Sequence, residues 1–191
     1  MLYKYRKLNK FKWIEDIIQN NRLHTDVYTE LNDPMEGIFK HKKLPKEIVA
    51  EIIREKEALR ICSLSKKYDE ALMLAHYSDG ERGIVIGIND KILKSNYTVH
   101  EINYDGIKDD VTKETPIVEI LSCKNSEWRY EQEVRVFSKK EYIDIVIEEI
   151  IMGSRISLEH EKKIELLVKV NPHIKIRKLD NALTRVRNRK G

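Results

Sequence analysis

Cysteine is scarce in this sequence of 191 residues, and its two cysteines do not form a recognisable site. Cys62 and Cys123 lie in apolar, strand-like surroundings, without a CxxC pair or the spacing of metal ligands. This pattern disfavours a disulfide framework and a zinc ribbon, and it predicts buried, reduced thiols in a cytosolic protein. Neither cysteine is expected in a loop that would expose a thiolate nucleophile.

Metal-binding, nucleotide-binding and membrane-spanning patterns are also missing. The six histidines are scattered, with no i,i+4 or HxH pair, so the sequence predicts no metal site. There is no GxGxxG or GxxxxGK[ST] motif to support a Rossmann or P-loop fold. No apolar run approaches the length of a membrane span, and residues 1–10 lack the apolar core of a signal peptide. We therefore expect a cytoplasmic protein without membrane contact.

The composition is typical of a globular protein. Hydrophobic residues make up 41% of the chain and charged residues 36%, with 36 basic against 32 acidic side chains. A net charge of only +4 argues against a disordered tail protein or a strongly basic coat protein. The length suits one α+β domain over residues 1–183, followed by a flexible basic tail over residues 184–191. The tail predicts weak attraction to nucleic acid through Arg185, Arg187, Arg189 and Lys190.

Hydrophobic periodicity predicts strands and helices in an α+β order rather than a doubly wound parallel sheet. Helical spacing occurs in a segment that ends at Asn20–Asn21, in a second that Pro45 starts, in residues 69–77, and in a last helix that Ser157 caps. Strands are expected at residues 2–6, 60–65, 83–88, 97–104, 116–123, 129–137 and 173–179, and strand-like pattern also covers residues 142–153.

The predicted strand over residues 129–137 has an unusual charged face. At a period of two, Arg129, Glu131, Glu133 and Arg135 share one side, and the two carboxylates would lie roughly 7 Å apart. Such a pair suits a division of labour, in which an arginine holds one carboxylate ionised while burial perturbs the other. The alternative is an exposed face whose ion pairs contribute little.

A second group of polar residues lies in the stretch AHYSDGERG, residues 75–83. His76, Tyr77, Asp79 and Arg82 crowd around a glycine turn between a predicted helix and a predicted strand. Tyr77 is suited to stack on a planar ring, and His76 or Arg82 is suited to meet a phosphate. The alternative is a tight turn with a half-buried histidine and a surface arginine.

A third motif, LNDPMEG at residues 31–37, predicts a rigid turn. Asn32 and Asp33 favour an Asx turn, Pro34 and Gly37 oppose regular structure, and Glu36 adds one more carboxylate.

Several of these stretches, in this order, resemble a bacterial family catalogued as domain of unknown function 2971. The resemblance is carried by LYKYR near the start, then NNRLHTD, LNDPMEG, ICSLS, MLAHYSDGERGIVIGI and EWRYEQEVRVF, and it covers residues 2 to about 137. The family is itself largely uncharacterised, so this resemblance implies no activity.

The layout also resembles the ADP-ribosyltransferase fold, a split antiparallel sheet that clamps NAD. That fold carries Arg or His on an early strand, Ser-x-Ser on a middle strand and Glu-x-Glu on a late strand. Here the early strand offers Arg6, with Lys4 as the alternative phase, and ICSLS offers Ser63 and Ser65. The late strand offers Glu131-Gln132-Glu133.

The resemblance implies roles for these residues in cleavage of the nicotinamide–ribose bond of NAD. Glu133 would stabilise the developing oxocarbenium ion, and Glu131 would orient or deprotonate the acceptor. The implied cofactor-binding residues are Arg6, Ser63, Ser65, His76 and Tyr77. The expected function is an NAD-dependent ADP-ribosyltransferase, a toxin or phage-defence effector that acts on a protein or a nucleic acid.

The alternative is a noncatalytic ligand- or nucleic-acid-binding module with a degenerate site. This alternative predicts that Arg135 or another cation neutralises Glu133.

Overall fold

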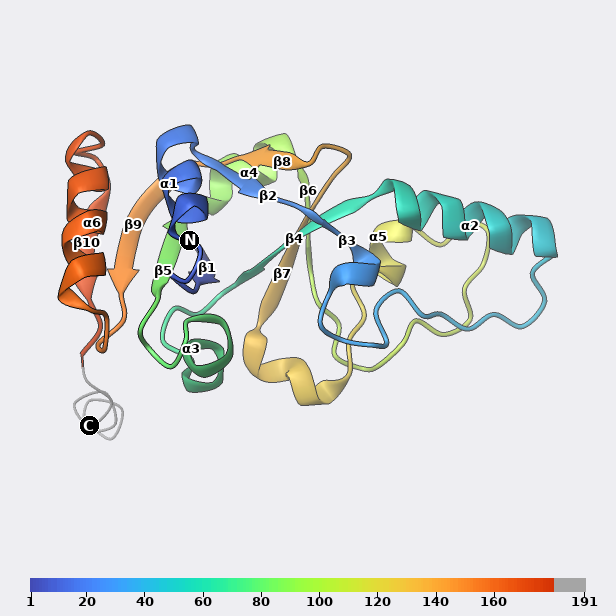
Figure 1. The fold of residues 1–191 in the computed structure, drawn as a ribbon. Helices are drawn as coiled ribbons and strands as arrows, with labels where there is room; N and C mark the ends of the chain where they lie inside the picture. The colour runs from blue at the N-terminus through green and yellow to red at the C-terminus, as the bar shows by residue number, and fades with distance from the viewer. Residues whose placement is uncertain (181–191) are drawn as a thin grey trace. The chain divides into compact units, whose positions relative to one another are not determined.

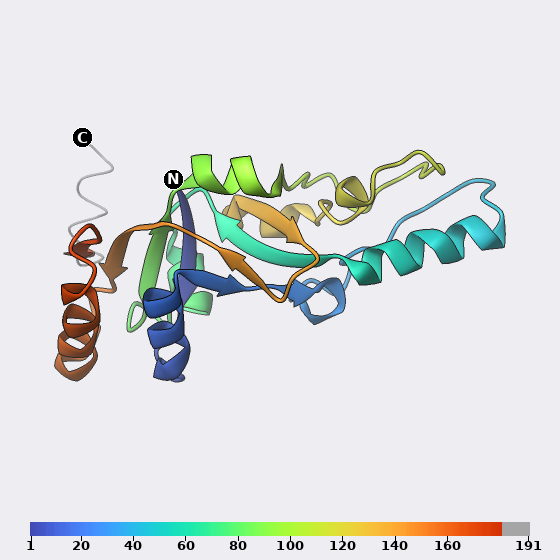
Figure 2. The same cartoon turned by 90° about the horizontal axis from the view of Figure 1, so that it is seen from above.

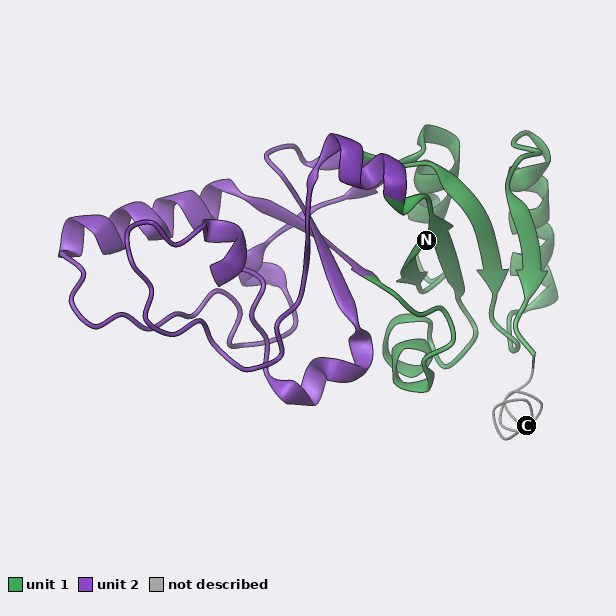
Figure 3. Ribbon diagram, turned by 180° about the vertical axis from the view of Figure 1, so that it is seen from behind, with its two compact units in different colours: residues 1–22, 65–90, 144–191 green, residues 23–64, 91–143 purple. Residues whose placement is uncertain are grey.

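The computed structural model of the protein describes residues 1–180. The basic tail expected at residues 184–191, with Arg185, Arg187, Arg189 and Lys190, lies outside the described residues. The chain divides into two compact units, each built from separate segments (Figure 3). Among the described residues, unit 1 comprises residues 1–22, 65–90 and 144–180, and unit 2 comprises residues 23–64 and 91–143.

The sheet of unit 1 has the strand order β10-β9-β5-β1. Its strands are β1 (Leu2–Arg6), β5 (Ile84–Ile88), β9 (Ile147–Met152) and β10 (Lys175–Lys178). The β1–β5 and β5–β9 pairs are antiparallel, whereas β9 and β10 are parallel. The parallel pair needs a crossover, and the helix α6 (Leu158–Lys169) supplies it. The sheet is therefore not wholly antiparallel, which differs from the expected pattern.

The helices of unit 1 are α1 (Phe11–Asn20), α3 (Ala71–Tyr77) and α6. Ile14, Ile17 and Ile18 form the buried face of α1, as their spacing predicts, and Asn21 ends the helix in the left-handed conformation. Ser157 caps α6 by accepting a hydrogen bond from the backbone N–H of His160, so this prediction is confirmed. Figures 1 and 2 show α6 lying along β9 and β10.

In unit 2, the strand order is β4-β7-β6, and β3 pairs with β4. These strands are β3 (Asp26–Val27), β4 (Arg60–Ser65), β6 (Thr98–Glu101) and β7 (Glu133–Ser138). The last residue of β4, Ser65, belongs to unit 1, where it pairs with Tyr3. A separate two-stranded sheet joins β2 (Arg22–His24) and β8 (Tyr142–Asp144).

Short helices and one long helix complete unit 2. They are α2 (Lys46–Ala58), α4 (Asp90–Asn96), α5 (Ile117–Ile120) and the 3-10 helices η1 (Tyr28–Glu30) and η2 (Ser126–Glu131). One core cluster contains Ile61, Leu121 and Phe137, and another joins α2 to α5 through Ile52 and Ile120. Figure 1 shows α2 and α5 near each other at one end of this unit.

Two strand predictions in unit 2 are wrong. Residues 116–123 contain the helix α5 rather than a strand, because Pro116 begins a turn of helix that buries Ile120. The predicted strand over residues 129–137 begins only at Glu133, because η2 occupies residues 126–131 and Gln132 is left-handed, with a φ of 43°. Along residues 1–180, no helix is both long and apolar enough to cross a membrane.

Candidate functional site

The four charged residues of the predicted strand do not share one strand face. Arg129 and Glu131 belong to η2, whereas Glu133 and Arg135 belong to β7. Glu131, Glu133 and Arg135 are nevertheless all buried. The left-handed turn at Gln132 breaks the alternation, and the two glutamates meet through a shared cation rather than through strand geometry.

Arg135 is the centre of this buried site. Its guanidinium is 0% exposed, and Nε donates to Oε1 of Glu133 at 2.8 Å while Nη2 donates to Oε2 at 3.3 Å. Nη1 donates to Oε2 of Glu36 at 2.7 Å and also to the carbonyl of Leu121, and Nη2 donates to the other oxygen of Glu36. The planar fork thus binds two carboxylates and one carbonyl, which is the geometry that arginine favours.

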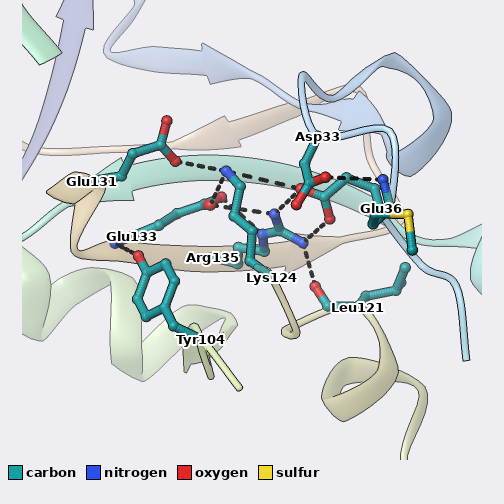
Figure 4. Close-up of polar contacts among 9 residues, drawn as sticks. Asp33, Glu36, Tyr104, Leu121, Lys124, Glu131, Glu133 and Arg135 are labelled. Carbon is teal, nitrogen blue, oxygen red and sulfur yellow. Dashed lines mark hydrogen bonds and ion pairs between the residues drawn. The ribbon is translucent and has the colours of Figure 1, made fainter. Parts of the chain in front are cut away.

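Lys124 is the second cation of the site, and the sequence analysis did not single it out. Its ammonium donates to Oε2 of Glu131 at 2.6 Å and to Oε2 of Glu133 at 3.0 Å. It also lies 4.0 Å from Glu36 and 4.6 Å from the ring centroid of Trp128. Figure 4 shows Glu131, Glu133 and Glu36 arranged around Lys124 and Arg135. No alternation marks Lys124, because it lies in the segment before η2 and reaches the glutamates only after folding.

The turn motif LNDPMEG contributes Glu36 to this site. Asp33 is 2% exposed, and its Oδ1 accepts a hydrogen bond from the backbone N–H of Met35 at 2.9 Å. The backbone N–H of Glu36 donates to the carbonyl of Asp33 at 3.0 Å, which closes the turn. The predicted Asx turn therefore positions a carboxylate for Arg135, although the sequence did not indicate that partner.

The charges around Glu133 determine its protonation. Burial alone would raise the pKa of this carboxyl, but the charges of Arg135 and Lys124 outweigh burial and lower the pKa to about 2. Burial raises the pKa of Glu36 despite its bonds to Arg135. The backbone N–H of Glu133 donates to the hydroxyl of Tyr104 at 2.7 Å, and burial raises the pKa of that phenol to about 12. Glu133 is therefore ionised and held between two cations at neutral pH.

Ser63 joins Glu133 in unit 2. It lies on β4, the neighbour of β7 in the sheet, and its side chain hydrogen-bonds to Glu133, which helps to lower the pKa of that carboxyl. This contact brings one serine of the predicted Ser-x-Ser pair to the Glu-x-Glu segment. Ser65 instead accepts a hydrogen bond from the backbone N–H of Lys67 at 3.0 Å, within unit 1.

The other predicted cofactor-binding residues also belong to unit 1. Arg6 ends β1 and pairs with Ile84, while His76 and Tyr77 form the last turn of α3 with ring centroids 6.3 Å apart. The candidate residues thus fall into two groups, with Glu131, Glu133 and Ser63 in unit 2 and Arg6, Ser65, His76 and Tyr77 in unit 1.

Among residues 1–180, no group of three or more His, Cys, Asp or Glu side chains is placed to hold a metal ion. Comparisons of the chain with protein-family models, with curated proteins and with solved structures found no match. The site itself is a buried, hydrogen-bonded network in which three glutamates surround two cations.

Proposed function

We propose that the protein is a noncatalytic ligand-binding module with a degenerate ADP-ribosyltransferase-like site. The observation that carries this proposal is the saturation of Glu133. Both of its carboxylate oxygens accept hydrogen bonds from cations, from Arg135 and Lys124 together. A noncatalytic module is expected to have such a neutralised carboxylate, whereas catalysis on NAD requires a carboxylate whose negative charge faces the ribose.

The electrostatic reason concerns the transition state of glycosidic cleavage. An oxocarbenium ion is stabilised by a nearby negative charge, and cations bound to that charge weaken the stabilisation. Arg135 and Lys124 each repel a developing cation, and their charges offset that of Glu133. A network of paired, buried charges is better suited to holding a rigid binding surface than to catalysing cleavage of a glycosidic bond.

The 3-10 helix η2 supplies the binding surface in this proposal. Trp128 and Tyr130 are half-buried, and their ring centroids lie 6.2 Å apart. Lys124 lies over the Trp128 ring, and Arg129 lies 5.5 Å from the ring centroid of Tyr104. Lys124 is buried and bonded to Glu131 and Glu133, so the exposed Arg129 is the cation available to a phosphate while a base stacks on an aromatic ring. The ligand class that fits is a nucleotide or a nucleic-acid base.

A second candidate function is NAD-dependent ADP-ribosyl transfer, and the contact between Ser63 and Glu133 favours it. In this case Glu133 binds a ribose hydroxyl, Glu131 serves the acceptor, and a protein or nucleic acid in the cytoplasm is modified. A toxin or phage-defence role belongs to this candidate alone.

One experiment separates the two candidates. The protein is incubated with NAD, nicotinamide release is followed by chromatography, and nucleotide binding is followed by calorimetry. We expect binding without nicotinamide release. We also expect Trp128→Ala to weaken binding about tenfold or more, the usual cost of one lost stacking contact.

The matched control is Trp13→Ala, since Trp13 is the other tryptophan and is 57% exposed on α1. This control should bind as the wild type does. Nicotinamide release that Glu133→Gln abolishes would establish cleavage of NAD and contradict a noncatalytic module. No binding of NAD, ADP or a single-stranded oligonucleotide would contradict the module.

A further inference from the structure

The turn between α3 and β5, residues 78–83, has an unusual backbone. Asp79, Gly80 and Glu81 follow one another in the left-handed region, with φ of 49°, 59° and 68°. Only glycine adopts this region without cost, and a strained residue persists only where its surroundings hold it. Strained backbone of this kind is common at ligand-binding sites, so the turn is a candidate for ligand binding.

Backbone hydrogen bonds hold the turn rigidly within unit 1. The N–H of Gly80 donates to the carbonyl of Leu74 at 3.1 Å, and the N–H of Gly83 donates to that of Ser78 at 2.9 Å. The segment after β9 adds two more bonds: the N–H of Gly153 donates to the carbonyl of Gly83 and the N–H of Arg155 to that of Glu81. These bonds join residues 78–83 to residues 153–155.

This junction brings two arginines together over Gly80. A Cβ placed on Gly80 would lie 3.5 Å from Nη1 of Arg82 and 3.8 Å from Nη1 of Arg155. Arg82 donates to the carbonyl of Asp79 at 3.2 Å, and Arg155 donates to that of Gly80 at 3.4 Å. Both side chains are exposed, and within residues 1–180 their polar partners are backbone carbonyls rather than carboxylates.

The positive charges of Arg82 and Arg155 repel each other, so their placement beside Gly80 requires an explanation. Elsewhere in unit 1 the basic side chains Arg22, Lys163 and Arg177 each pair with a carboxylate. Here Glu81, an acidic residue of the same turn, already accepts a hydrogen bond from the hydroxyl of Ser154. Each guanidinium has five N–H groups and uses few of them in these hydrogen bonds, so N–H donors remain available on the solvent side of the turn.

We infer that Arg82 and Arg155 form an anion-binding site for a phosphate or diphosphate group. The two planar forks match phosphate oxygens, and both Nη1 atoms lie within 4 Å of the position that a Cβ on Gly80 would take, so one anion can contact both side chains. The rigid turn means that little ordering is required on binding. The site lies within unit 1 and goes beyond the function proposed for unit 2, so either can fail without the other.

The test is a titration of the full chain with inorganic pyrophosphate against sodium chloride of matched ionic strength. Matching is necessary because salt alone screens exposed charges. Wild-type protein should gain about 3 °C in Tm at a ligand concentration ten times Kd. In ¹⁵N-labelled protein, the backbone signals of Gly80, Arg82 and Arg155 should move.

The double variant Arg82→Gln/Arg155→Gln should lose at least tenfold in affinity for pyrophosphate. Its control, Lys12→Gln/Lys162→Gln, removes two exposed charges from α1 and α6 and should bind as the wild type does. Equal effects of chloride and pyrophosphate, or wild-type affinity in the arginine variant, would overturn the inference. A single-stranded oligonucleotide that binds where pyrophosphate does not would also overturn it, by assigning the surface to a nucleic acid.

Discussion

Arg135 shows how a fully buried charge is tolerated. An isolated guanidinium in an apolar interior costs several kcal/mol, and its partners must offset that cost by direct hydrogen bonds. Glu133 and Glu36 provide carboxylates on two sides, and Leu121 provides a carbonyl. Burial alone would lower the pKa of Arg135, but Glu133 and Glu36 outweigh burial and raise it, so the side chain stays charged.

Removal of Arg135 should therefore be strongly destabilising. Arg135→Leu leaves Glu133 and Glu36 buried without their main cation, and we expect a loss of about 3–5 kcal/mol in the free energy of unfolding. Urea denaturation measures this loss. The control is Lys163→Leu, which breaks the exposed pair with Glu159 and should cost less than about 1 kcal/mol. Similar losses for both variants would show that the Arg135 network adds no more than a surface pair.

Among the elements, the helix α6 is one that the local sequence is sufficient to predict. Ser157 has an extended backbone, its hydroxyl accepts from the N–H of His160, and Glu159 and Glu161 lie in the first turn. Each feature stabilises the positive end of the helix. Ile164 and Val168 then face inward at i,i+4 spacing.

The cap gives a prediction for α6. Ser157→Ala should lower the free energy of unfolding by about 1 kcal/mol, because an N–H in the first turn loses its acceptor. Ser157→Asp retains an acceptor and a favourable charge, and we expect it to match the wild type within about 0.5 kcal/mol. Thermal unfolding of the three proteins checks both values. An equal loss in the aspartate variant would mean that Ser157 acts through something other than capping.

The β7 region is the counterexample among the elements. Alternation of polar and apolar residues predicted a strand from residue 129, yet η2 and the left-handed Gln132 precede β7. The cation pairs of Lys124 with Glu131 and Glu133 are satisfied in this arrangement. The alternation continues through residues 129–132, which precede β7, so the predicted strand was too long.

At the scale of the whole molecule, the buried glutamates make stability depend on pH. Glu133 has a folded-state pKa of about 2, below its ordinary value of 4.5. Between these values the unfolded chain binds more protons than the folded chain, so the free energy of unfolding falls as pH falls from about 5 to 2. Glu36 acts in the opposite direction, because burial raises its pKa and penalises its charged form.

Glu133→Gln should flatten this dependence. We expect the variant to be less stable at neutral pH and to lose less stability on acidification than the wild type, as measured by urea unfolding at pH 7, 5 and 3. Glu165→Gln, at an exposed position of α6, is the control and should retain the wild-type slope. A wild-type slope in Glu133→Gln would mean that another group dominates the acid sensitivity.

The candidate site was only partly predictable from the sequence. Glu131 and Glu133 were chosen from strand alternation and Ser63 from the fold resemblance, and the three residues do lie together in unit 2. Lys124 and Tyr104 were missed, since Lys124 belongs to no predicted element or motif and Tyr104 only ends the predicted strand over residues 97–104. The role of Glu36 was also missed, because its partner Arg135 is 99 residues away in the chain.

Local sequence patterns were sufficient to predict β1, the apolar face and end of α1, and the capped helix α6. These features depend on backbone geometry and on neighbours within a few residues, so a short stretch of sequence is sufficient to predict them. The glutamates of EWRYEQEVRVF, by contrast, are buried and bound to cations through tertiary contacts that these patterns did not predict. Burial and ion pairing depend on which distant segments meet, and residue periodicity carries no information about that meeting.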